Sequence, residues 1–187
     1  MKEKVLHIPT LKLFNNNWDL LQQYLNRKSN PLYSIGGRLI LFGLKIKSFE
    51  NLTSVGGYLD LRYSSIESLG NLTSVGGRLD LRYSNIESIG NLTSVGGSLD
   101  LYKTKIKTLG NLTSVGGSLD LYKTKITTLG NLTSVGGSLD LYGSNIESLG
   151  SLTSVGGDLD LKNTQLSKKY SEKEIRKIVS VKGKIYL

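Results

Sequence analysis

A sixteen-residue segment occurs twice without a single change, and this repetition constrains the fold more than any other feature of the chain. The stretch NLTSVGGSLDLYKTKI spans 91–106 and returns at 111–126. The triplet Leu-Asp-Leu marks the same place in six copies, whose aspartates are spaced by twenty residues: Asp60, Asp80, Asp100, Asp120, Asp140 and Asp160. A fixed period of about 20 to 29 residues is typical of stacked solenoids, in which each unit buries its apolar face only against its neighbours.

One repeat indicates which residues face inward. In 99–101 two leucines flank an aspartate, which is the period-2 pattern of a half-buried strand. The next apolar residues follow at gaps of three to five, too irregular for a long helix: Ile106, Leu109, Leu112 and Val115. Because twenty residues leave no room for a crossover helix, we expect short turns or 3₁₀ segments on the return side. Gly116 and Gly117 are expected to supply backbone conformations that other residues avoid.

The spacing of these positions resembles the leucine-rich repeat, in particular the short, regular repeats with a Val-Gly-Gly corner of bacterial and bacteriophage proteins. The similarity covers 31–166, with Thr104 or Ser64 in the slot that usually holds Asn or Cys. A hydroxyl caps only one backbone group there. The resemblance implies an α/β solenoid, a right-handed coil of about eight parallel strands, counting degenerate triplets at 39–41 and 185–187. It also implies a host-directed or anti-defence role.

The two ends of the chain depart from the repeat and are expected to cap it. Segment 17–28 has apolar residues at helical spacing, so 1–30 is expected to form an N-terminal cap. Ser171 and Glu174 have the spacing of a helix capping box. Residues 167–187 are therefore expected to form a helical C-terminal cap and the last strand, in one cooperative domain with the solenoid.

The repeated aspartates lie between inward leucines, so we expect them to point outward as an exposed column. Neighbouring strands are about 4.8 Å apart, and adjacent like charges cost about 0.2–1 kcal/mol per pair. Three explanations for the column are therefore open: it is inherited by duplication of the repeat without a function, its charge is compensated by basic neighbours, or it is used for binding. Arg62 and Arg82, two residues after Asp60 and Asp80, are placed to compensate it.

A surface of Asp, Tyr and Arg is typical of protein-binding patches, because Tyr and Arg supply contact area and directional bonds. The predicted protein-binding residues are Tyr58, Asp60, Arg62, Arg78, Asp80, Arg82, Asp100, Tyr102, Asp120, Tyr122, Asp140 and Tyr142. We thus expect a non-enzymatic protein-binding module, for example an inhibitor. A homodimer through this face or through a cap stays open.

The alternative is binding to nucleic acid or another polyanion through the caps and five lysines, which otherwise form a solvated rim: Lys103, Lys105, Lys107, Lys123 and Lys125. The chain has 24 basic and 15 acidic residues, a net charge of +9. Counted by segment, 8 − 3 = +5 falls on 1–50, 8 − 10 = −2 on 51–160 and 8 − 2 = +6 on 161–187. The excess therefore lies on the ends, which favours nucleic acid less than a basic stripe would.

The residue inventory narrows the function classes further. The chain has no cysteine, which excludes disulfides and thiolate metal sites, and its one histidine is His7. A uniform carboxylate column lacks the two contrasting environments of a catalytic pair, so we expect no enzyme, metal or cofactor. No apolar run of 18 residues and no secretory signal is evident, so we expect no membrane span and a cytoplasmic location in a bacterium or an infected host cell.

Overall fold

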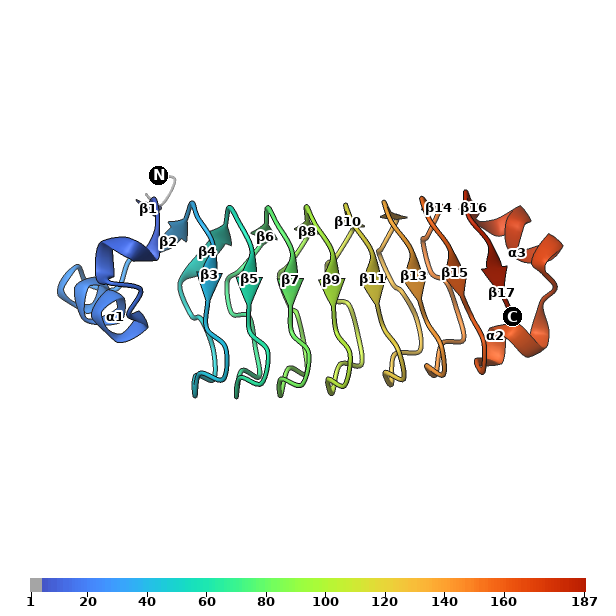
Figure 1. Ribbon diagram of the computed structural model, residues 1–187, viewed down its shortest axis with the longest axis horizontal. Coiled ribbons are helices and arrows are strands. Elements are labelled where there is room, and N and C mark those ends of the chain that lie inside the picture. Colours follow the sequence, from blue (N-terminus) through green and yellow to red (C-terminus); the bar gives the residue numbers. More distant parts are fainter. Residues whose placement is uncertain (1–4) are drawn as a thin grey trace.

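The computed structural model describes residues 5–187 and shows a parallel β-solenoid with a 20-residue period (Figure 1). Two sheets run along the stack, and each 20-residue turn, here called a coil, contributes one strand to each. Sheet A contains, in spatial order, β1 (Leu6–Ile8), β2 (Tyr33–Ile35), β4 (Leu52–Val55), β6 (Ser74–Val75), β8 (Ser94–Val95), β10 (Ser114–Val115), β12 (Ser134–Val135), β14 (Ser154–Val155) and β16 (Ser180–Val181). Sheet B contains β3 (Leu39–Ile40), β5 (Leu59–Asp60), β7 (Leu79–Asp80), β9 (Leu99–Asp100), β11 (Leu119–Asp120), β13 (Leu139–Asp140), β15 (Leu159–Asp160) and β17 (Ile185–Tyr186).

The second sheet corrects the expected return path. About eight strands were predicted, but that number describes sheet B alone, and sheet A adds nine. Short turns or 3₁₀ segments were expected where sheet A runs, yet within 5–187 the one 3₁₀ helix is η1 (Leu11–Phe14), outside the repeats. The Thr residues explain why the return path is extended and pairs with its neighbours. The Thr113 N–H donates to the Thr93 carbonyl at 2.9 Å, and the Thr113 hydroxyl donates to the same oxygen at 3.0 Å.

The core between the two sheets consists of columns of apolar side chains, in which most coils repeat the same residue type. Every inward residue of the central coil is at most 2% exposed: Leu99, Leu101, Ile106, Leu109, Leu112 and Val115. The strands pair in register, so Leu99 faces both Leu79 and Leu119. Burying one Leu, Ile or Val side chain contributes about 1.5–3 kcal/mol, which makes stacking of coils the main source of stability.

The Gly-Gly corner has a different basis from the one expected. Neither Gly96 nor Gly97 has a positive φ, so left-handed backbone is not the reason for glycine here. A Cβ on Gly96 would overlap the carbonyl oxygen of Gly76, and one on Gly97 would lie 2.7 Å from the Arg78 nitrogen. Glycine is needed because consecutive coils approach each other at their backbones.

A second turn follows each sheet B strand. The residue before the Thr or Ser slot is left-handed, with φ of 57° at Tyr63 and 54° at Lys103. The hydroxyl of Ser64 donates to the Leu61 carbonyl at 2.6 Å, so it caps one backbone group as expected. This turn fixes where the side chains at the strand exits lie.

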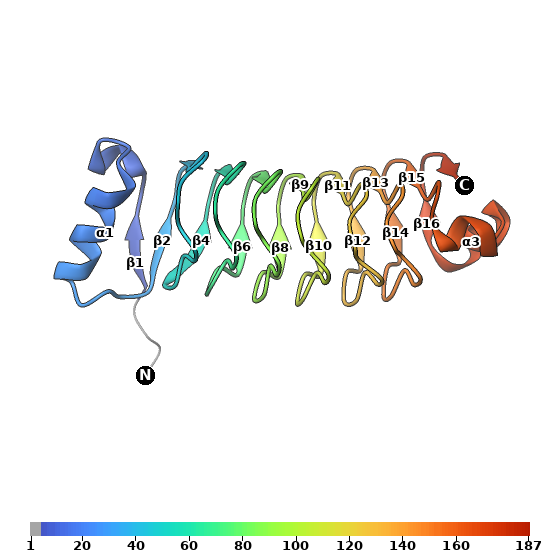
Figure 2. The same cartoon turned by 90° about the horizontal axis from the view of Figure 1, so that it is seen from below.

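Helices lie at both ends of the stack (Figures 1 and 2). At one end α1 (Trp18–Arg27) lies beside β1, and at the other are α2 (Gln165–Lys169) and α3 (Glu172–Ile178), of which α3 lies beside β16. The predicted capping box of Ser171 and Glu174 is present at the start of α3. Of the predicted N-terminal cap 1–30, residues 1–4 lie outside the described part, and 5–30 contain a strand as well as a helix, since β1 pairs with β2 at the edge of sheet A. None of the helices in 5–187 is long and apolar enough to span a membrane.

Candidate functional site on the outer face of sheet B

The aspartates of the repeat do not form the exposed column that was expected. Asp60, Asp80 and Asp100 are only 2%, 0% and 8% exposed, and the three later ones are partly buried. In every coil the Oδ1 atom accepts a hydrogen bond from the N–H two residues later, as Asp120 does from Tyr122 at 2.9 Å. The common task of these carboxylates is therefore to hold the exit of each strand.

Arginines cover the carboxylates of the first coils, as predicted. Arg62 donates two hydrogen bonds to the Asp60 carboxylate, from Nε to Oδ1 at 3.0 Å and from Nη2 to Oδ2 at 2.7 Å. Arg82 grips Asp80 in the same way, at 2.9 and 2.6 Å. Burial opposes ionisation of Asp60, but the hydrogen bonds and charge of Arg62 outweigh it and lower the pKa of this carboxyl. Tyr58 lies beside this pair, and burial followed by the charge of Asp60 raises its pKa.

Arg78 extends this network to a third carboxylate. Its Nη2 atom lies 3.2 Å from Asp80 Oδ2 and 3.1 Å from Asp100 Oδ2. Arg82 Nε also approaches Asp100 Oδ2, at 3.1 Å. Burial nevertheless raises the pKa of Asp100, with the hydrogen bond from the Tyr102 N–H and the arginines acting against it. Three arginines and three aspartates thus form one connected cluster over β5, β7 and β9.

Beyond this cluster the carboxylates stand without arginines. Burial raises the pKa of Asp120 to about 6, the Tyr122 N–H opposes the shift, and the charges of Asp100 and Asp140 add to it. Burial also raises the pKa of Asp140, and the charge of Asp160 contributes. The expectation of near-identical environments is therefore wrong, because neighbouring coils supply different partners to the same residue type.

A groove marks the uncovered stretch. It has a volume of about 290 Å³, and Arg78 is the one basic residue among those that line it. Its walls and floor come from β9, β11 and β13 and the serines before them: Ser98, Asp100, Ser118, Asp120, Ser138 and Asp140. In the preceding coils the side chains of Arg62 and Arg82 occupy the corresponding space over their own carboxylates.

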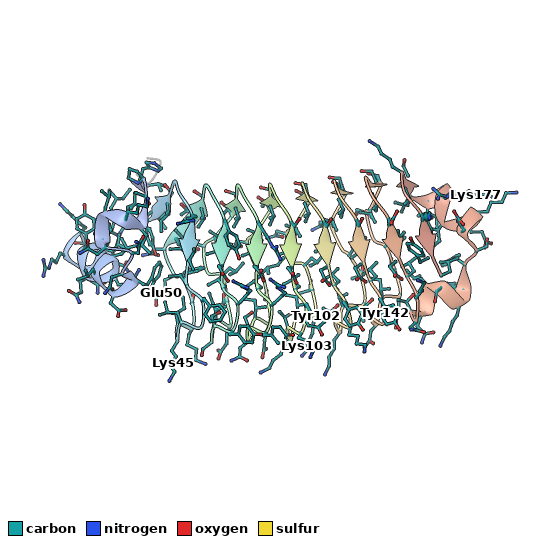
Figure 3. The ribbon with its side chains drawn as sticks, viewed as in Figure 1. Lys45, Glu50, Tyr102, Lys103, Tyr142 and Lys177 are labelled. Atoms are coloured by element: carbon teal, nitrogen blue, oxygen red, sulfur yellow. The ribbon has the colours of Figure 1, made fainter. Side chains whose placement is uncertain are left out.

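An unbroken row of six aromatic rings runs beside the aspartates: Phe42, Tyr63, Tyr83, Tyr102, Tyr122 and Tyr142. Successive ring centroids are 4.7 to 5.5 Å apart. The rings of Tyr63 and Tyr83 are stacked at 3°. Figure 3 shows Tyr102 and Tyr142 on the same side of the sheet B strands.

The sequence prediction missed Phe42, Tyr63 and Tyr83. The last two come one residue later in the coil than Tyr102, so a comparison by strict position separates them. Reading the two positions after Leu-Asp-Leu together reveals the row, as Arg-Tyr, Arg-Tyr, Tyr-Lys, Tyr-Lys and Tyr-Gly in successive coils. The left-handed turn brings the later position to the same line.

The five lysines of the alternative site divide into two groups. Lys103 Nζ lies 5.4 Å from the ring centroids of both Tyr83 and Tyr102, and Lys123 Nζ lies 5.2 Å from that of Tyr122. These two belong to the aromatic row. The others line a separate pocket of about 220 Å³ with Glu87 and Thr104: Lys105, Lys107 and Lys125.

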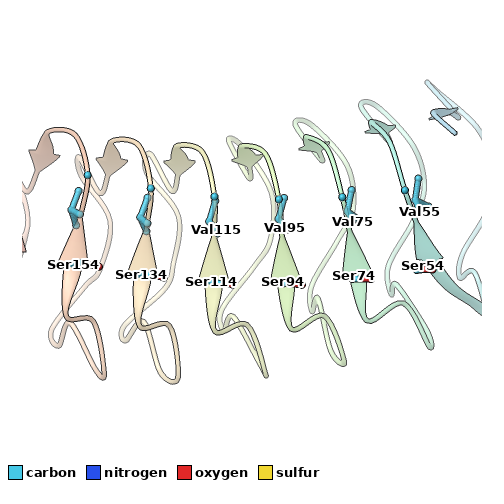
Figure 4. Close-up of a pocket in the computed structure, with 18 of the residues that line it drawn as sticks. Ser54, Val55, Ser74, Val75, Ser94, Val95, Ser114, Val115, Ser134 and Ser154 are labelled. Carbon is cyan, nitrogen blue, oxygen red and sulfur yellow. The ribbon is translucent and has the colours of Figure 1, made fainter. Parts of the chain in front are cut away.

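The outer face of sheet A is chemically uniform by comparison. A shallow groove of about 580 Å³ follows the Ser-Val-Gly segments from coil to coil (Figure 4). Beside it the Thr hydroxyls donate to the carbonyl one coil earlier, for example Thr93 to Thr73 at 2.9 Å. Among its lining residues only Lys182 is charged, so this face offers few directional contacts.

Within residues 5–187 no group of three or more His, Cys, Asp or Glu side chains is arranged to hold a metal ion. His7 is engaged with Ser34, its Nδ1 lying 3.0 Å from the hydroxyl oxygen. The outer face of sheet B therefore combines arginine forks, a carboxylate groove and an aromatic row. Comparison of the chain with family models, with curated proteins and with solved structures gives no match.

Proposed function

We propose that this chain is a non-enzymatic protein-binding module that acts through the outer face of sheet B. The observation that carries the proposal is the aromatic row, which runs unbroken along a face that also presents arginines and carboxylates. Phe42, Tyr63 and Tyr83 are 56%, 55% and 40% exposed. Aromatic residues and Arg are enriched in protein interfaces and dominate their binding energy.

The face is also preorganised. Four tyrosines contact a ring on either side and Tyr142 contacts one ring, while Arg62 and Arg82 are each fixed by two hydrogen bonds to an aspartate. Binding loses about 0.5–1.5 kcal/mol for each flexible side chain that it immobilises. A row of side chains already held in place avoids much of that cost, which supports binding to a folded partner.

The geometry of the rings supports protein over nucleic acid. Bases and sugars bind aromatic side chains through the ring face. The faces of Tyr63 and Tyr83, and of Tyr122 and Tyr142, are stacked on each other at 4.7 and 5.1 Å. Tyr63, Tyr83 and Tyr122 each contact a further ring as well, so edges and hydroxyls are what these rings mainly offer, and these suit hydrogen bonds and edge contacts with protein side chains.

The finer part of the proposal concerns the kind of partner. The leucine spacing of the repeat supports a relation to the short leucine-rich repeats of bacterial and bacteriophage proteins, and with it a role as an inhibitor of a host or defence protein in the cytoplasm. The return side of each coil forms a second sheet here, where short turns or 3₁₀ segments were expected.

Polyanion binding is the second candidate, favoured by the net charge of +9 and by the pocket of Lys105, Lys107 and Lys125. The division of the lysines weakens it, because Lys103 and Lys123 lie over tyrosines and away from that pocket. The two candidates differ in salt response. Polyanion binding falls steeply with salt, whereas contacts through tyrosines depend on it much less.

Affinity capture from a bacterial lysate tests the function when it compares matched variants. We expect the protein to retain a partner after nuclease treatment and a high-salt wash, and Tyr102→Ala combined with Tyr122→Ala to weaken that retention about tenfold or more, since two rings of the row are lost. The control, Ser94→Ala with Ser114→Ala, changes the outer face of sheet A and should retain the partner. Equal retention by both double variants would place the interface elsewhere, and recovery of only nuclease-sensitive material would favour the lysine pocket.

A further inference from the structure

Charge is distributed unevenly along the outer face of sheet B, from one end of the stack to the other. The first three strands, β3, β5 and β7, are flanked by four basic and two acidic side chains, a net of 4 − 2 = +2: Arg38, Arg62, Arg78, Arg82, Asp60 and Asp80. The next four, β9 to β15, are flanked by three basic and five acidic side chains, a net of 3 − 5 = −2: Lys103, Lys123, Lys162, Asp100, Asp120, Asp140, Asp158 and Asp160. One face therefore carries a basic half and an acidic half.

We propose that this face binds a second copy of the chain, face to face, with the two stacks running in opposite directions. The inference rests on the proposed function, because it uses the same face, and it names the partner. A surface that meets its own copy across a twofold axis is self-complementary only if opposite features are placed symmetrically about that axis. The two charged halves satisfy this condition.

The axis is fixed by the positions of the charges. If it lies between the two faces, parallel to the strands and through β9, then β3, β5 and β7 of one copy lie opposite β15, β13 and β11 of the other. Equal strand positions lie opposite each other in this arrangement, so the Arg62 guanidinium, which covers Asp60, faces Asp140, and the Arg78 guanidinium, which lies on Asp80, faces Asp120. Asp100 meets its own copy on the axis, where Arg78 and Arg82 already neutralise it. Stacks running in the same direction would instead place like charges opposite each other.

The same operation brings the two aromatic rows together. A twofold axis parallel to the strands keeps the strand exits of both copies on one side, so the rows lie opposite each other. Tyr102 then meets Tyr102 of the other copy, Tyr83 meets Tyr122, and Tyr63 meets Tyr142. The rings of Phe42 and Tyr63, more than half exposed in the single chain, become covered. Charge and aromatic contacts are thus satisfied by one arrangement.

The spacing of the groups favours this occupant. Arg62 and Arg82 are one coil apart, as are Asp120 and Asp140. Their repeat of about 4.8 Å differs from the spacing of about 6.6–6.8 Å between side chains on one face of an extended strand. A second copy therefore stays in register over several coils. Arg78 is available for a contact, since its side chain is 44% exposed and a guanidinium has five N–H donors.

The size of the face predicts a reversible dimer. The seven strands that meet, β3 to β15, at about 4.8 Å give a length of about 29 Å, and five residues at about 3.3 Å give a width of about 16 Å. The resulting area of about 500 Å² per copy is below the roughly 800 Å² of a standard interface. We therefore expect dimerisation that depends on protein concentration and weakens with salt, because charged pairs contribute to it.

Analytical ultracentrifugation tests the association. At low salt and rising concentration we expect a mass of 41 kDa, twice the 20.5 kDa of one chain. Replacing Asp120 and Asp140 with Asn keeps the Oδ1 acceptor for the strand exit but removes both charges, and should weaken dimerisation about tenfold or more. Glu87→Gln with Glu147→Gln removes two charges from the coil edges and should leave it unchanged. A single-chain mass at every concentration would overturn the inference.

Cysteine cross-linking tests the geometry, because the natural chain contains no cysteine. A Tyr102→Cys variant should be joined into a dimer by a bifunctional maleimide, because sheets packed face to face lie about 10 Å apart and a disulfide needs Cα atoms within about 7 Å. A mixture of Tyr63→Cys and Tyr142→Cys chains should cross-link to each other in preference to themselves, and Ser94→Cys on sheet A should stay monomeric. Cross-linking of Tyr63→Cys mainly to itself, or efficient cross-linking through Ser94→Cys, would contradict the antiparallel arrangement.

The outcomes separate this inference from the proposed function. If the chain stays monomeric but the Tyr102 and Tyr122 double variant still loses a captured protein, the second copy is wrong as the partner and the face remains a protein-binding site. If neither a dimer nor a captured protein depends on these tyrosines, both proposals fail. Dimerisation that depends on Asp120, Asp140 and Tyr102 supports both.

Discussion

At the scale of single residues, one aspartate repeated six times performs one shared task in six different settings. In each coil it accepts a hydrogen bond from the N–H two residues later, so the strand exit is the same throughout. Its ionisation differs because Arg62 and Arg82 are present only in the first coils. The pKa is lowered at Asp60 and raised at Asp120, although the two residues have the same backbone position.

This contrast predicts opposite effects of the same substitution. The folded pKa of Asp120, about 6, lies above the unfolded value of about 3.9. Between these values the folded chain binds more protons, so this group penalises stability fully above pH 6 and the penalty disappears as the pH falls. We expect Asp120→Asn to increase the free energy of unfolding at pH 7.5 by about 1 kcal/mol, after allowing for solvent screening.

Asp60 is the matched comparison. Its lowered pKa contributes stability that is present at neutral pH and is lost as the pH falls below the unfolded value. Asp60→Asn leaves Arg62 without its carboxylate and should cost about 1–3 kcal/mol at pH 7.5. Urea unfolding at pH 7.5 and at pH 5 measures the stability of both variants. The charges that act on Asp120 in the folded chain are those of Asp100, Asp140 and Arg82. Effects of equal sign would contradict the two environments.

Residue-level prediction from the sequence succeeded where an interaction lies within one coil and failed where it depends on neighbouring coils. Arg62 reaches Asp60 two residues away, and the spacing alone predicted that contact. The burial of Asp80 and the stacking of Tyr63 on Tyr83 arise between coils, at distances set by the stack. Position-by-position comparison also separated Tyr83 from Tyr102, which the left-handed turn brings together.

At the scale of elements, sheet A shows what the hydrophobic pattern could not predict. Its strands in the regular coils are two residues long, as in Ser114–Val115, too short to display an alternating pattern. The strand Leu99–Asp100 is equally short, but the flanking Leu101 completes a recognisable triplet. Sheet A is held by backbone and Thr hydroxyl bonds between coils, which leave no periodic signal inside one coil.

The end of sheet A depends on one side chain. Arg176 of α3 donates from Nη1 to the Val181 carbonyl at 2.7 Å and from Nη2 to the Gly183 carbonyl at 2.9 Å. One coil earlier, the equivalent Val155 carbonyl accepts a hydrogen bond from the Lys182 N–H at 3.0 Å. Glu172 orients the guanidinium through Nε at 2.9 Å. An edge of unpaired backbone groups is a site of fraying and of unwanted strand pairing.

Arg176→Met is therefore expected to loosen the last coil selectively. Loss of the two hydrogen bonds should cost about 1–3 kcal/mol locally, so amide exchange in 180–186 should become faster while β9 and β11 remain protected. Lys177→Met, on the same helix, removes one charge without these contacts and serves as the control. Unchanged exchange in 180–186 would show that α3 protects this edge by packing alone.

At the scale of the whole molecule, the structure is a one-dimensional stack whose stability is a sum over coils and their interfaces. Each interior coil contacts the coils before and after it through the same set of buried residues and the same two ladders. The identity of 91–106 and 111–126 makes the interior coils interchangeable. Helices at both ends cover the core, with Leu25 at 0% and Ile175 at 1% exposure.

Removing one complete repeat tests this additivity. Deletion of 111–130 joins Gly110 to Asn131, which restores the Gly-Asn junction found before Asn71, Asn91 and Asn111. We expect the shortened chain to fold with the same circular dichroism per residue and with a Tm lower by roughly 5–10 °C, because one coil and one interface are lost. Deletion of 111–120 removes half a coil, places sheet A residues against sheet B residues and should prevent folding. Failure of the full-repeat deletion to fold would mean that the particular sequence of coils, and not the stacking of any matching coil, stabilises this protein.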